Sequence, residues 1–486
     1  MYDYISLIRK DKFLFFIPFL TIATRLIIFL FIPFTFEDAY ITFRYAENFA
    51  NGFGLVYNIG ERVYGTTTPI FAIMLGTFKL IGVPCVVSSL FINLLAEGMT
   101  SLIIYKILKD NSNRVIAAVI SLIYVFSPSN ISWSILGMET AFFTSVIALS
   151  FFSFYKKKYF LALFLGFLSA IIRIDGLSVT LVILISSLIE KKLSVFKMFL
   201  IPLTLFIGWL TLLYIYFGNF LPNAMIAKII VYSYHQPSVL RNFKVIPEKF
   251  FIAGSYSSSI LTIFFLIGAF LIFKRRNKLY PMIAWFFIYY LGLILSKTNI
   301  FGWYLIPPLF VYITISGVAI IFVFSYLMRF FNWNQNLLHA FIFLCVMFFS
   351  TITLPSKINQ ISNEYKYQQN VRIRVGKYLN KYTPVNSTVF VEAIGAIGYY
   401  SDRYIYDDFA LISPIFLELN KSSYNAESRY KKIKLVNPNY LVIRNKYLNE
   451  FYTKTRLLNE YSPIKVFEYH SDNPIFVPMT IFRRNK

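Results

Sequence analysis

Charged residues and cysteines are scarce in this sequence. Of its 486 residues only 14% are charged, whereas 57% are hydrophobic and the mean hydropathy is +0.61. Soluble globular domains carry about 25% charged residues, so the composition argues against that class and indicates a polytopic α-helical membrane protein. The two cysteines, Cys85 and Cys345, lie far apart in the sequence. No disulfide framework is therefore expected.

The sequence also lacks the motifs of several common enzyme classes. It contains no GxxxxGK[ST] phosphate loop, no HExxH pair and no cluster of Cys or His residues, so it offers neither a nucleotide-phosphate loop nor a usual zinc site. It shows no internal repeat of the kind that many transporters have. No small-residue cleavage site follows the first apolar run, at 13–34. We therefore expect a retained membrane span there and not a signal peptide.

Acidic residues are about half as common as basic ones. The 23 Asp and Glu stand against 47 Lys and Arg, which gives a formal net charge of +24. In a soluble protein this excess would suggest a nucleic-acid partner, but here much of it lies in short runs between apolar segments, and such runs mark cytoplasmic loops. We therefore expect no nucleic-acid partner, a protein integral to the plasma (bacterial inner) membrane, and a cytoplasmic N-terminus.

Apolar runs that approach the roughly 20 residues of a membrane span alternate with these basic clusters. The positive-inside rule is satisfied if the run at 70–82 belongs to the first outer loop, as a helix on or in the membrane surface. About eleven spans then remain, and they place the first outer loop at 34–84. The predicted spans are 13–34, 86–105, 115–128, 139–155, 159–172, 177–189, 198–217, 253–273, 279–296, 303–328 and 336–354.

The character of the chain changes after residue 354. The long apolar runs end, and short strand-like and helical segments follow. We therefore predict a transmembrane domain at 1–354 and a soluble extracytoplasmic α/β domain at 355–486. Its strands are expected at 388–393, 440–443, 464–469 and 475–482, and its helices at 358–382 and 425–436.

Within the first outer loop, residues 37–69 read EDAYITFRYAENFANGFGLVYNIGERVYGTTTP. Helical spacing places Asp38, Thr42 and Tyr45 on one face and Glu37 and Arg44 on the neighbouring face, so two carboxylates and an arginine share about one turn. The glycines that follow indicate tight bends or close approach to a ligand. Two interpretations are open: Asp38 belongs to a functional site, or it only caps the start of a surface helix.

Arg173 and Asp175 lie between two short apolar runs, at 159–172 and 177–189. Isolated charges are costly in the hydrocarbon of a membrane, so such residues are paired or hydrated and are functional candidates by default. A purely structural Arg173–Asp175 ion pair is the alternative.

Several motifs together resemble one family. The stretch at 37–69 is followed in chain order by GMET (137–140), RIDG (173–176), LPNA (221–224) with Lys228, WYLIP (303–307) and IGAIGYY (394–400). They resemble motifs of the bacterial GT-C membrane glycosyltransferases, in particular the group of mycobacterial AftB-like terminal arabinofuranosyltransferases. Glu37 departs from that family, in which Asp is commoner at this position.

The resemblance implies an inverting glycosyltransferase that moves a sugar from a polyprenyl-phosphate donor to a glycan, glycolipid or glycoprotein acceptor at the outer face of the membrane. The sugar would be arabinofuranose or another pentose. Asp38 corresponds to the family's catalytic aspartate, with Glu37 beside it. Arg173, Lys228 and Arg44 are expected at the donor phosphate, although an interfacial lysine often only reaches for lipid head groups. The residues expected to bind substrate are Tyr40, Arg62, Tyr64, Glu139, Asp175, Asn223, Trp303 and Tyr304.

The expected chemistry needs few groups. The acceptor hydroxyl must lose a proton, and the leaving phosphate must be stabilised. Because phosphate is a good leaving group, one general base suffices and the acid of a glycosidase is not required. No cofactor is implied with certainty, but a divalent cation (Mg²⁺ or Mn²⁺) held by Glu37 and Asp38 is an open alternative. A transporter of polysaccharide or lipid-linked sugar, or an O-antigen-type polymerase, is the alternative function.

Overall fold

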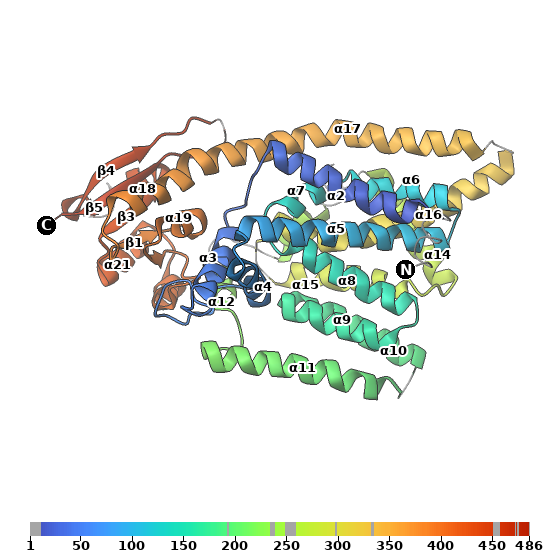
Figure 1. Cartoon of the computed structure of the whole chain (residues 1–486), viewed down its shortest axis with the longest axis horizontal. Helices are drawn as coiled ribbons and strands as arrows, with labels where there is room; N and C mark the ends of the chain where they lie inside the picture. Colours follow the sequence, from blue (N-terminus) through green and yellow to red (C-terminus); the bar gives the residue numbers. More distant parts are fainter. Residues whose placement is uncertain are drawn as a thin grey trace.

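The computed structural model has an elongated shape, with a bundle of long helices at one end and a smaller region containing a sheet at the other (Figure 1). The first described residues lie in the bundle and the C-terminus lies at the far end of the sheet region (Figure 1). The structure describes residues 11–191, 194–233, 239–247, 259–296, 299–331, 335–450, 457–471, 473 and 476–485.

A helix stands at each predicted span, within the described residues. Four are long and apolar enough to cross a membrane, or five if α6 and α7 (Pro128–Ile135), bent by 60° at their junction, count as one span. Apart from α17, which has 33 residues, the other helices at predicted spans have 12 to 16 residues, so the number eleven stays a prediction. These helices are α2 (Phe13–Phe31), α5 (Cys85–Asp110), α6 (Arg114–Val125), α8 (Thr140–Tyr155), α9 (Tyr159–Ile172), α10 (Leu177–Lys191), α11 (Ser194–Phe217), α14 (Ser259–Lys274), α15 (Tyr280–Leu295), α16 (Pro307–Phe331) and α17 (Gln335–Tyr367).

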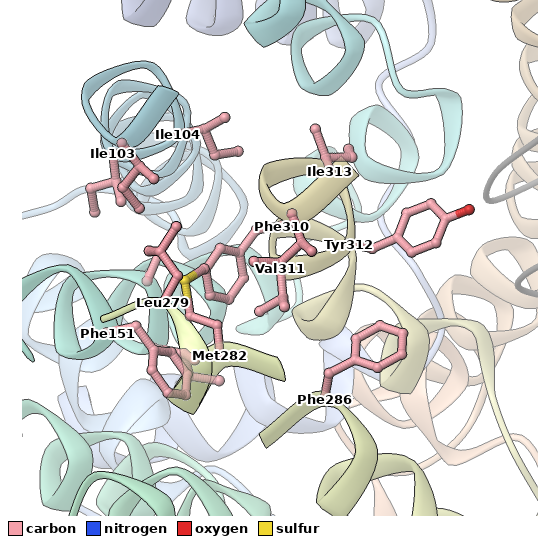
Figure 2. Close-up of a cluster of buried hydrophobic side chains, with 14 of the residues drawn as sticks. Ile103, Ile104, Phe151, Leu279, Met282, Phe286, Phe310, Val311, Tyr312 and Ile313 are labelled. Atoms are coloured by element: carbon pink, nitrogen blue, oxygen red, sulfur yellow. The ribbon is translucent and has the colours of Figure 1, made fainter. Parts of the chain in front are cut away.

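The bundle is packed around buried aromatic and branched side chains. Phe151 of α8, Met282 and Phe286 of α15, and Phe310 of α16 are each at most 2% exposed, and Figure 2 shows them gathered with their neighbours between these helices. Large apolar side chains also cover the outside of the bundle, such as Ile215, which is 72% exposed. An apolar exterior of this extent is expected where lipid is the solvent.

One buried ionic network crosses the bundle, and the sequence analysis did not single it out. Arg25 of α2 and Glu97 of α5 are both fully buried, and two guanidinium nitrogens donate to Glu97 Oε2 at 3.2 and 3.0 Å. Asn130 donates to the same oxygen at 2.6 Å, and the Tyr124 hydroxyl donates to Oε1 at 3.1 Å. Arg25 also donates to the carbonyl oxygens of Tyr124 and Val125, at the end of α6. The pair therefore ties α2 and α5 to the bend between α6 and α7.

Removal of one partner from this pair is expected to destabilise the bundle strongly. Glu97→Ala would leave the Arg25 guanidinium buried without its counter-charge, which costs about 3–5 kcal/mol. Thermal unfolding of the purified protein in detergent measures the effect. The exposed pair of Glu427 and Lys431 provides the control, since Glu427→Ala should cost at most about 1 kcal/mol. Equal melting temperatures for the two variants would show that the buried pair contributes nothing special.

The C-terminal region contains a five-stranded sheet of order β2-β1-β3-β5-β4. Strands β2 (Tyr404–Asp407), β1 (Thr388–Val391) and β3 (Tyr440–Arg444) run parallel, and β5 (Met479–Arg484) and β4 (Tyr461–Phe467) join antiparallel. The four predicted strands are present, whereas the short β2 was missed. The sheet carries α19 (Ile394–Ser401), α20 (Leu417–Ser422) and α21 (Ala426–Val436), the last of which begins with a capping box at Asn425.

The predicted boundary at residue 354 falls inside a helix. α17 passes through it with Pro355 in its interior and continues through the π-helical segment Gln368–Ile373 into α18 (Arg374–Tyr382). Figure 1 shows this long helix running along the bundle to the sheet region. The loss of apolar character at this point predicted a domain boundary, and a helix was expected only from residue 358. In the structure one helix crosses the boundary, because its surroundings change there and its helical propensity does not.

Candidate active site

A cavity of about 520 Å³ lies where the bundle meets the C-terminal region. Its walls come from the start of α3 (Ala39–Ala50), the segment before α4 (Pro69–Leu80), α12 (Asn223–Ser233), α15 and the segment at 299–304. Figure 1 shows α3, α4 and α12 at this junction. The ionisable and aromatic residues that line the cavity are Asp38, Glu139, Arg173, Asp175, Lys228, Tyr232, Tyr289, Phe301, Trp303 and Tyr304.

Asp38 and Lys228 face each other in this cavity. Asp38 Oδ2 lies 4.0 Å from Lys228 Nζ, and the two side chains are 34% and 22% exposed. Asp38 occupies the N-cap position of α3, but its side chain makes no capping hydrogen bond. The interpretation of Asp38 as only a helix cap is therefore wrong for this structure. The Asp38 carboxylate is partly exposed and does not cap the helix, so it is available to a ligand in the cavity.

Arg173 is the centre of a second charged group. Its Nε and Nη2 donate to the two oxygens of Asp175 at 3.1 and 2.8 Å, and Nη1 donates to Glu139 Oε1 at 3.4 Å. The guanidinium lies against the rings of Phe143 and Tyr304, at 4.7 and 5.3 Å. The predicted alternative of an Arg173–Asp175 ion pair is confirmed. Because the pair also lines the cavity, a structural and a functional role are compatible here.

Aromatic side chains form one wall of the cavity. Trp303 stacks on Phe301 with ring centroids 4.4 Å apart and an interplanar angle of 4°, and it lies edge-on to Trp133 at 5.5 Å. Lys228 Nζ lies 6.0 Å from the Trp303 ring, and Tyr304 is adjacent at 5.6 Å. Packing on both sides fixes Trp303, so that this wall has a defined position beside Lys228.

Two expected site residues, Glu37 shortly before α3 and Arg44 within it, point away from the cavity. Glu37 is 9% exposed and pairs with Arg372 at 3.5 Å, and it does not line the cavity. Arg44 donates to the carbonyl oxygens of Tyr57, Gly398 and Arg403. Its guanidinium therefore holds backbone together, and the prediction that it binds the donor phosphate is wrong. Six residues of a helix, at about 100° per residue, leave the directions of Asp38 and Arg44 roughly 120° apart. The two side chains therefore face different neighbours.

Four predicted substrate-binding residues also lie outside the cavity lining. The Tyr40 hydroxyl lies 3.5 Å from that of Tyr400, and Tyr64 stacks on Phe217 at 4.7 Å. Arg62 lies over the Tyr216 ring at 4.9 Å. Asn223 donates to the carbonyl oxygens of Ala410 and Leu411 at 2.6 and 2.9 Å. Tyr40 and Asn223 thus contact the C-terminal region, whereas Arg62 and Tyr64 pack on α11. None of the four lines the cavity in this structure.

The glycines of the motif at 394–400 have a packing reason. A Cβ atom at Gly395 would lie 1.9 Å from the Glu37 carbonyl oxygen, and one at Gly398 would lie 1.8 Å from the Tyr57 hydroxyl. The backbone of α19 at Gly395 therefore lies in direct contact with the backbone of Glu37, the residue before Asp38. Tyr399 and Tyr400 of the same motif do not line the cavity but line a separate pocket.

Gly395→Ala is expected to push α19 away from Glu37. Overpacking of this kind typically costs about 1–3 kcal/mol, and here it would also displace Asp38, which follows Glu37 in the chain. We expect a lower melting temperature together with reduced activity. Gly208→Ala on α11 is the control, because nothing lies within 4 Å of a Cβ atom there and the residue does not line the cavity. An unchanged melting temperature for Gly395→Ala would refute this contact.

The sequence analysis missed several residues of the cavity. The Tyr289 hydroxyl donates to Asp175 Oδ2 at 3.2 Å and to the Tyr304 carbonyl oxygen at 3.0 Å. A tyrosine inside the apolar run at 279–296 was the available signal. Leu411 reaches the cavity from the loop after β2, where Asp407 accepts hydrogen bonds from the backbone of residues 409, 411 and 412. Nothing in the sequence indicated that this loop returns to the membrane-facing site.

The loop after β2 is anchored on its other side by Asp408. This buried carboxylate pairs with Arg429 at 2.6 Å and with Lys432 at 2.7 Å, both from α21. Burial alone would raise the pKa of Asp408, but the charges of Arg429 and Lys432 outweigh it and lower that pKa to about 2. This anchor is therefore ionised throughout the neutral range. Burial raises the pKa of the neighbouring Asp407, which accepts the Leu411 amide, to about 7.

The residues at the cavity do not fit a divalent cation. Glu37 and Asp38 do not converge, because Glu37 pairs with Arg372 and the charged neighbour of Asp38 is the ammonium of Lys228. No cluster of three or more His, Cys, Asp or Glu side chains with metal-binding geometry occurs among the residues that the structure describes. A hard cation prefers several oxygen ligands, which this arrangement does not supply.

The fold is shared with solved membrane glycosyltransferases. ArnT from Cupriavidus metallidurans in the apo state matches with a TM-score of 0.62 at 11% identity, covering 96% of this chain and 97% of that one. ArnT bound to undecaprenyl phosphate gives 0.59 at 11% identity, with 95% and 97% covered. The apo oligosaccharyltransferase of Archaeoglobus fulgidus gives 0.60 at 13% identity, with 91% and 70% covered.

These proteins are members of the GT-C superfamily, and at such identities the likeness establishes the fold. Residues 359–481 match a family model described as a domain of unknown function, DUF8728. No protein with curated annotation matches the sequence significantly. The chain therefore has a GT-C-like fold, whereas the AftB-like grouping stays a prediction.

Proposed function

We propose that this protein is an inverting GT-C glycosyltransferase that takes its sugar from a polyprenyl-phosphate donor. The observation that carries the proposal is the Asp38–Lys228 pair, 4.0 Å apart in a cavity of a GT-C-like fold. The pair combines a candidate general base with a cation suited to a phosphate. An ArnT of the same fold has been solved with undecaprenyl phosphate, which supports a lipid-linked donor.

In the proposed reaction, Asp38 takes the proton of the acceptor hydroxyl, and the acceptor oxygen forms a bond to the anomeric carbon as the bond from that carbon to the phosphate oxygen breaks. The polyprenyl phosphate leaves with its electron pair, and Lys228 stabilises it. Lysine carries its charge on a flexible stem. The donor phosphate can therefore draw the ammonium away from Asp38, which frees the carboxylate to act as a base.

Arg173 has a different place in this proposal from Lys228. Two of its nitrogens are held by Asp175 and a third faces Glu139. A phosphate would have to compete with two carboxylates for it, so we assign Lys228 as the first phosphate ligand and Arg173 as a secondary one. Through Arg173, Asp175 and Glu139 are held at the cavity wall, where their oxygens can orient sugar hydroxyls. Trp303 and Tyr304 offer ring faces to the sugar.

The substrates and the orientation are part of the proposal. The motif resemblance favours arabinofuranose or another pentose as the sugar, and a cell-surface glycan, glycolipid or glycoprotein as acceptor. The positive-inside pattern favours a cytoplasmic N-terminus and an outward-facing C-terminal region, which a reporter fused after Lys486 would test. The alternative of a transporter or polymerase is less well supported. The charged residues gather in one cavity, and the Asp38 carboxylate at the start of α3 makes no capping hydrogen bond and is paired with Lys228 there.

Comparison of surface glycans tests the proposed function in the cell. Mass analysis of the glycans, glycolipids and glycoproteins of cells with and without the gene should show one class that loses a sugar of a single mass. Re-expression of the wild-type protein should restore that sugar, whereas Asp38→Asn should not. Identical glycan profiles, with lipid-linked sugar left on the wrong side of the membrane, would favour the transporter.

A further inference from the structure

A second pocket, of about 380 Å³, lies between α3, α18 and α19. Unlike the reaction cavity, it is lined almost wholly by polar side chains. Its walls include two carboxylates, two cations, three amides and two tyrosines. These are Glu47, Asp402, Arg44, Lys377, Asn48, Asn51, Asn380, Tyr399 and Tyr400.

Part of this lining is rigidly held. Arg44 is bound to three backbone carbonyl oxygens, and the Asn48 amide donates to those of Val56 and Tyr57 at 2.9 and 3.0 Å. Glu47 accepts from Tyr399 at 2.7 Å and from Lys79 at 3.0 Å, both at Oε1. Its second carboxylate oxygen therefore faces a fixed direction with capacity to accept hydrogen bonds.

The rest of the lining is open to solvent. Asn51, Lys377, Asn380 and Asp402 are exposed, and Lys377 lies over the half-buried ring of Tyr400 at 5.6 Å. The pocket thus offers donors and acceptors side by side with an aromatic surface. Sugar hydroxyls are both donors and acceptors and require this mixture. Glu47 is paired with Lys79, and Arg44 is held by carbonyl oxygens. The exposed charges are therefore Lys377 and Asp402, one of each sign, which favours a neutral ligand over a phosphate or a cation.

Helix α3 connects this pocket to the reaction cavity. Asp38 and Thr42 line the cavity, and Glu47 and Asn51 line the pocket. At about 1.5 Å rise and 100° per residue, the centres of the two pairs lie roughly 13 Å apart along the helix and about 180° apart around it. A chain of several linked sugar residues that passes around α3 is needed to reach both sites. A single sugar or a small alcohol would reach only one of the two sites.

From this arrangement we infer that the pocket of Glu47, Asn51, Lys377, Asp402 and Tyr400 binds a neutral glycan segment of the acceptor, a few residues away from the hydroxyl that reacts at Asp38. The inference rests on the proposed function and narrows it, because it makes the acceptor an oligosaccharide chain. The pocket would hold the chain, and the cavity would act on its end.

Direct binding tests the inference without requiring transfer. Full-length protein in lipid nanodiscs is titrated by calorimetry with a disaccharide and a hexasaccharide released from the surface glycan of its source cells. The variant Lys377→Ala with Asp402→Ala removes two exposed polar groups of the pocket. Lys431→Ala with Glu427→Ala removes a matched exposed pair on α21. Melting temperatures of both variants establish that they are folded.

We expect the wild type, the α21 control and Asp38→Asn to bind the hexasaccharide alike. The pocket variant should bind it roughly tenfold more weakly, as the loss of one or two hydrogen bonds implies, and the disaccharide should show no such difference. Wild-type protein that binds no oligosaccharide, or a folded pocket variant that binds all of them normally, overturns the inference. The expected binding pattern in a protein that transfers no sugar would instead refute the proposed function and retain the glycan pocket.

Discussion

Asp38→Asn is expected to lower the rate of sugar transfer by about 10²- to 10⁴-fold, the usual contribution of a positioned general base. Asparagine keeps nearly the same shape but cannot take a proton from the acceptor hydroxyl. The native side chain makes no capping hydrogen bond, so the substitution removes no helix cap and the melting temperature should change little. Steady-state kinetics with a lipid-linked donor measure the effect, and the loss should appear in kcat more than in KM.

Glu37→Gln is the matched control for this experiment. Glu37 precedes Asp38 in the chain but pairs with Arg372 and does not line the cavity. We therefore expect a change in stability with a smaller loss of rate. An Asp38→Asn enzyme that transfers sugar at nearly the native rate would refute the assignment of the base, and Asp175 would be the next carboxylate to test.

Lys228→Ala should reduce turnover by roughly ten- to a thousandfold, the range expected when a charged contact to a leaving group is removed. The same substitution also takes away the counter-charge of Asp38, which lies 4.0 Å from the ammonium. Binding of polyprenyl phosphate should weaken in parallel. Measurement of both quantities separates a role in phosphate binding from a role confined to Asp38.

Arg173→Lys is the informative comparison for Lys228. A lysine keeps the charge but cannot bridge Asp175 with two nitrogens as Arg173 does, at 3.1 and 2.8 Å. We expect a lower melting temperature with a moderate loss of rate. A wild-type rate in Lys228→Ala together with a complete loss in Arg173→Lys would reverse the two assignments.

The sequence predicted the parts of the fold that depend on local composition. Apolar runs located the helices of the bundle, and Asn425 with Asn437 bounded α21, whose last residue precedes a left-handed Asn437 at φ 44°. The strand β2 was missed because its sequence, YIYD, is too short to show a period. The Arg25–Glu97 pair was missed because its partners lie 72 residues apart, and no local pattern connects them.

The sequence also predicted part of the site, because many of its residues lie in short local motifs. Asp38, Glu139, Arg173, Asp175, Lys228, Trp303 and Tyr304 come from five of the six motifs and line one cavity. Arg44 and Tyr64 lie in the stretch at 37–69 as well, but both are used in packing. Arg44 donates to the Gly398 carbonyl oxygen, and Tyr64 stacks on Phe217. A motif records that a residue type is needed without recording whether chemistry or packing needs it. The direction of each side chain decides between the two, and only the tertiary structure supplies it.

The most direct test of the central claim is a transfer assay with a defined donor. Purified protein in nanodiscs is given a polyprenyl-phosphate sugar with a radiolabelled sugar moiety, together with surface glycan as acceptor, and a nucleotide sugar is offered in a parallel reaction. We expect label to pass to the glycan from the lipid-linked donor only, with release of polyprenyl phosphate. Asp38→Asn should abolish nearly all of this transfer. Transfer from the nucleotide sugar but not from the lipid-linked donor would contradict the proposed use of a polyprenyl-phosphate donor.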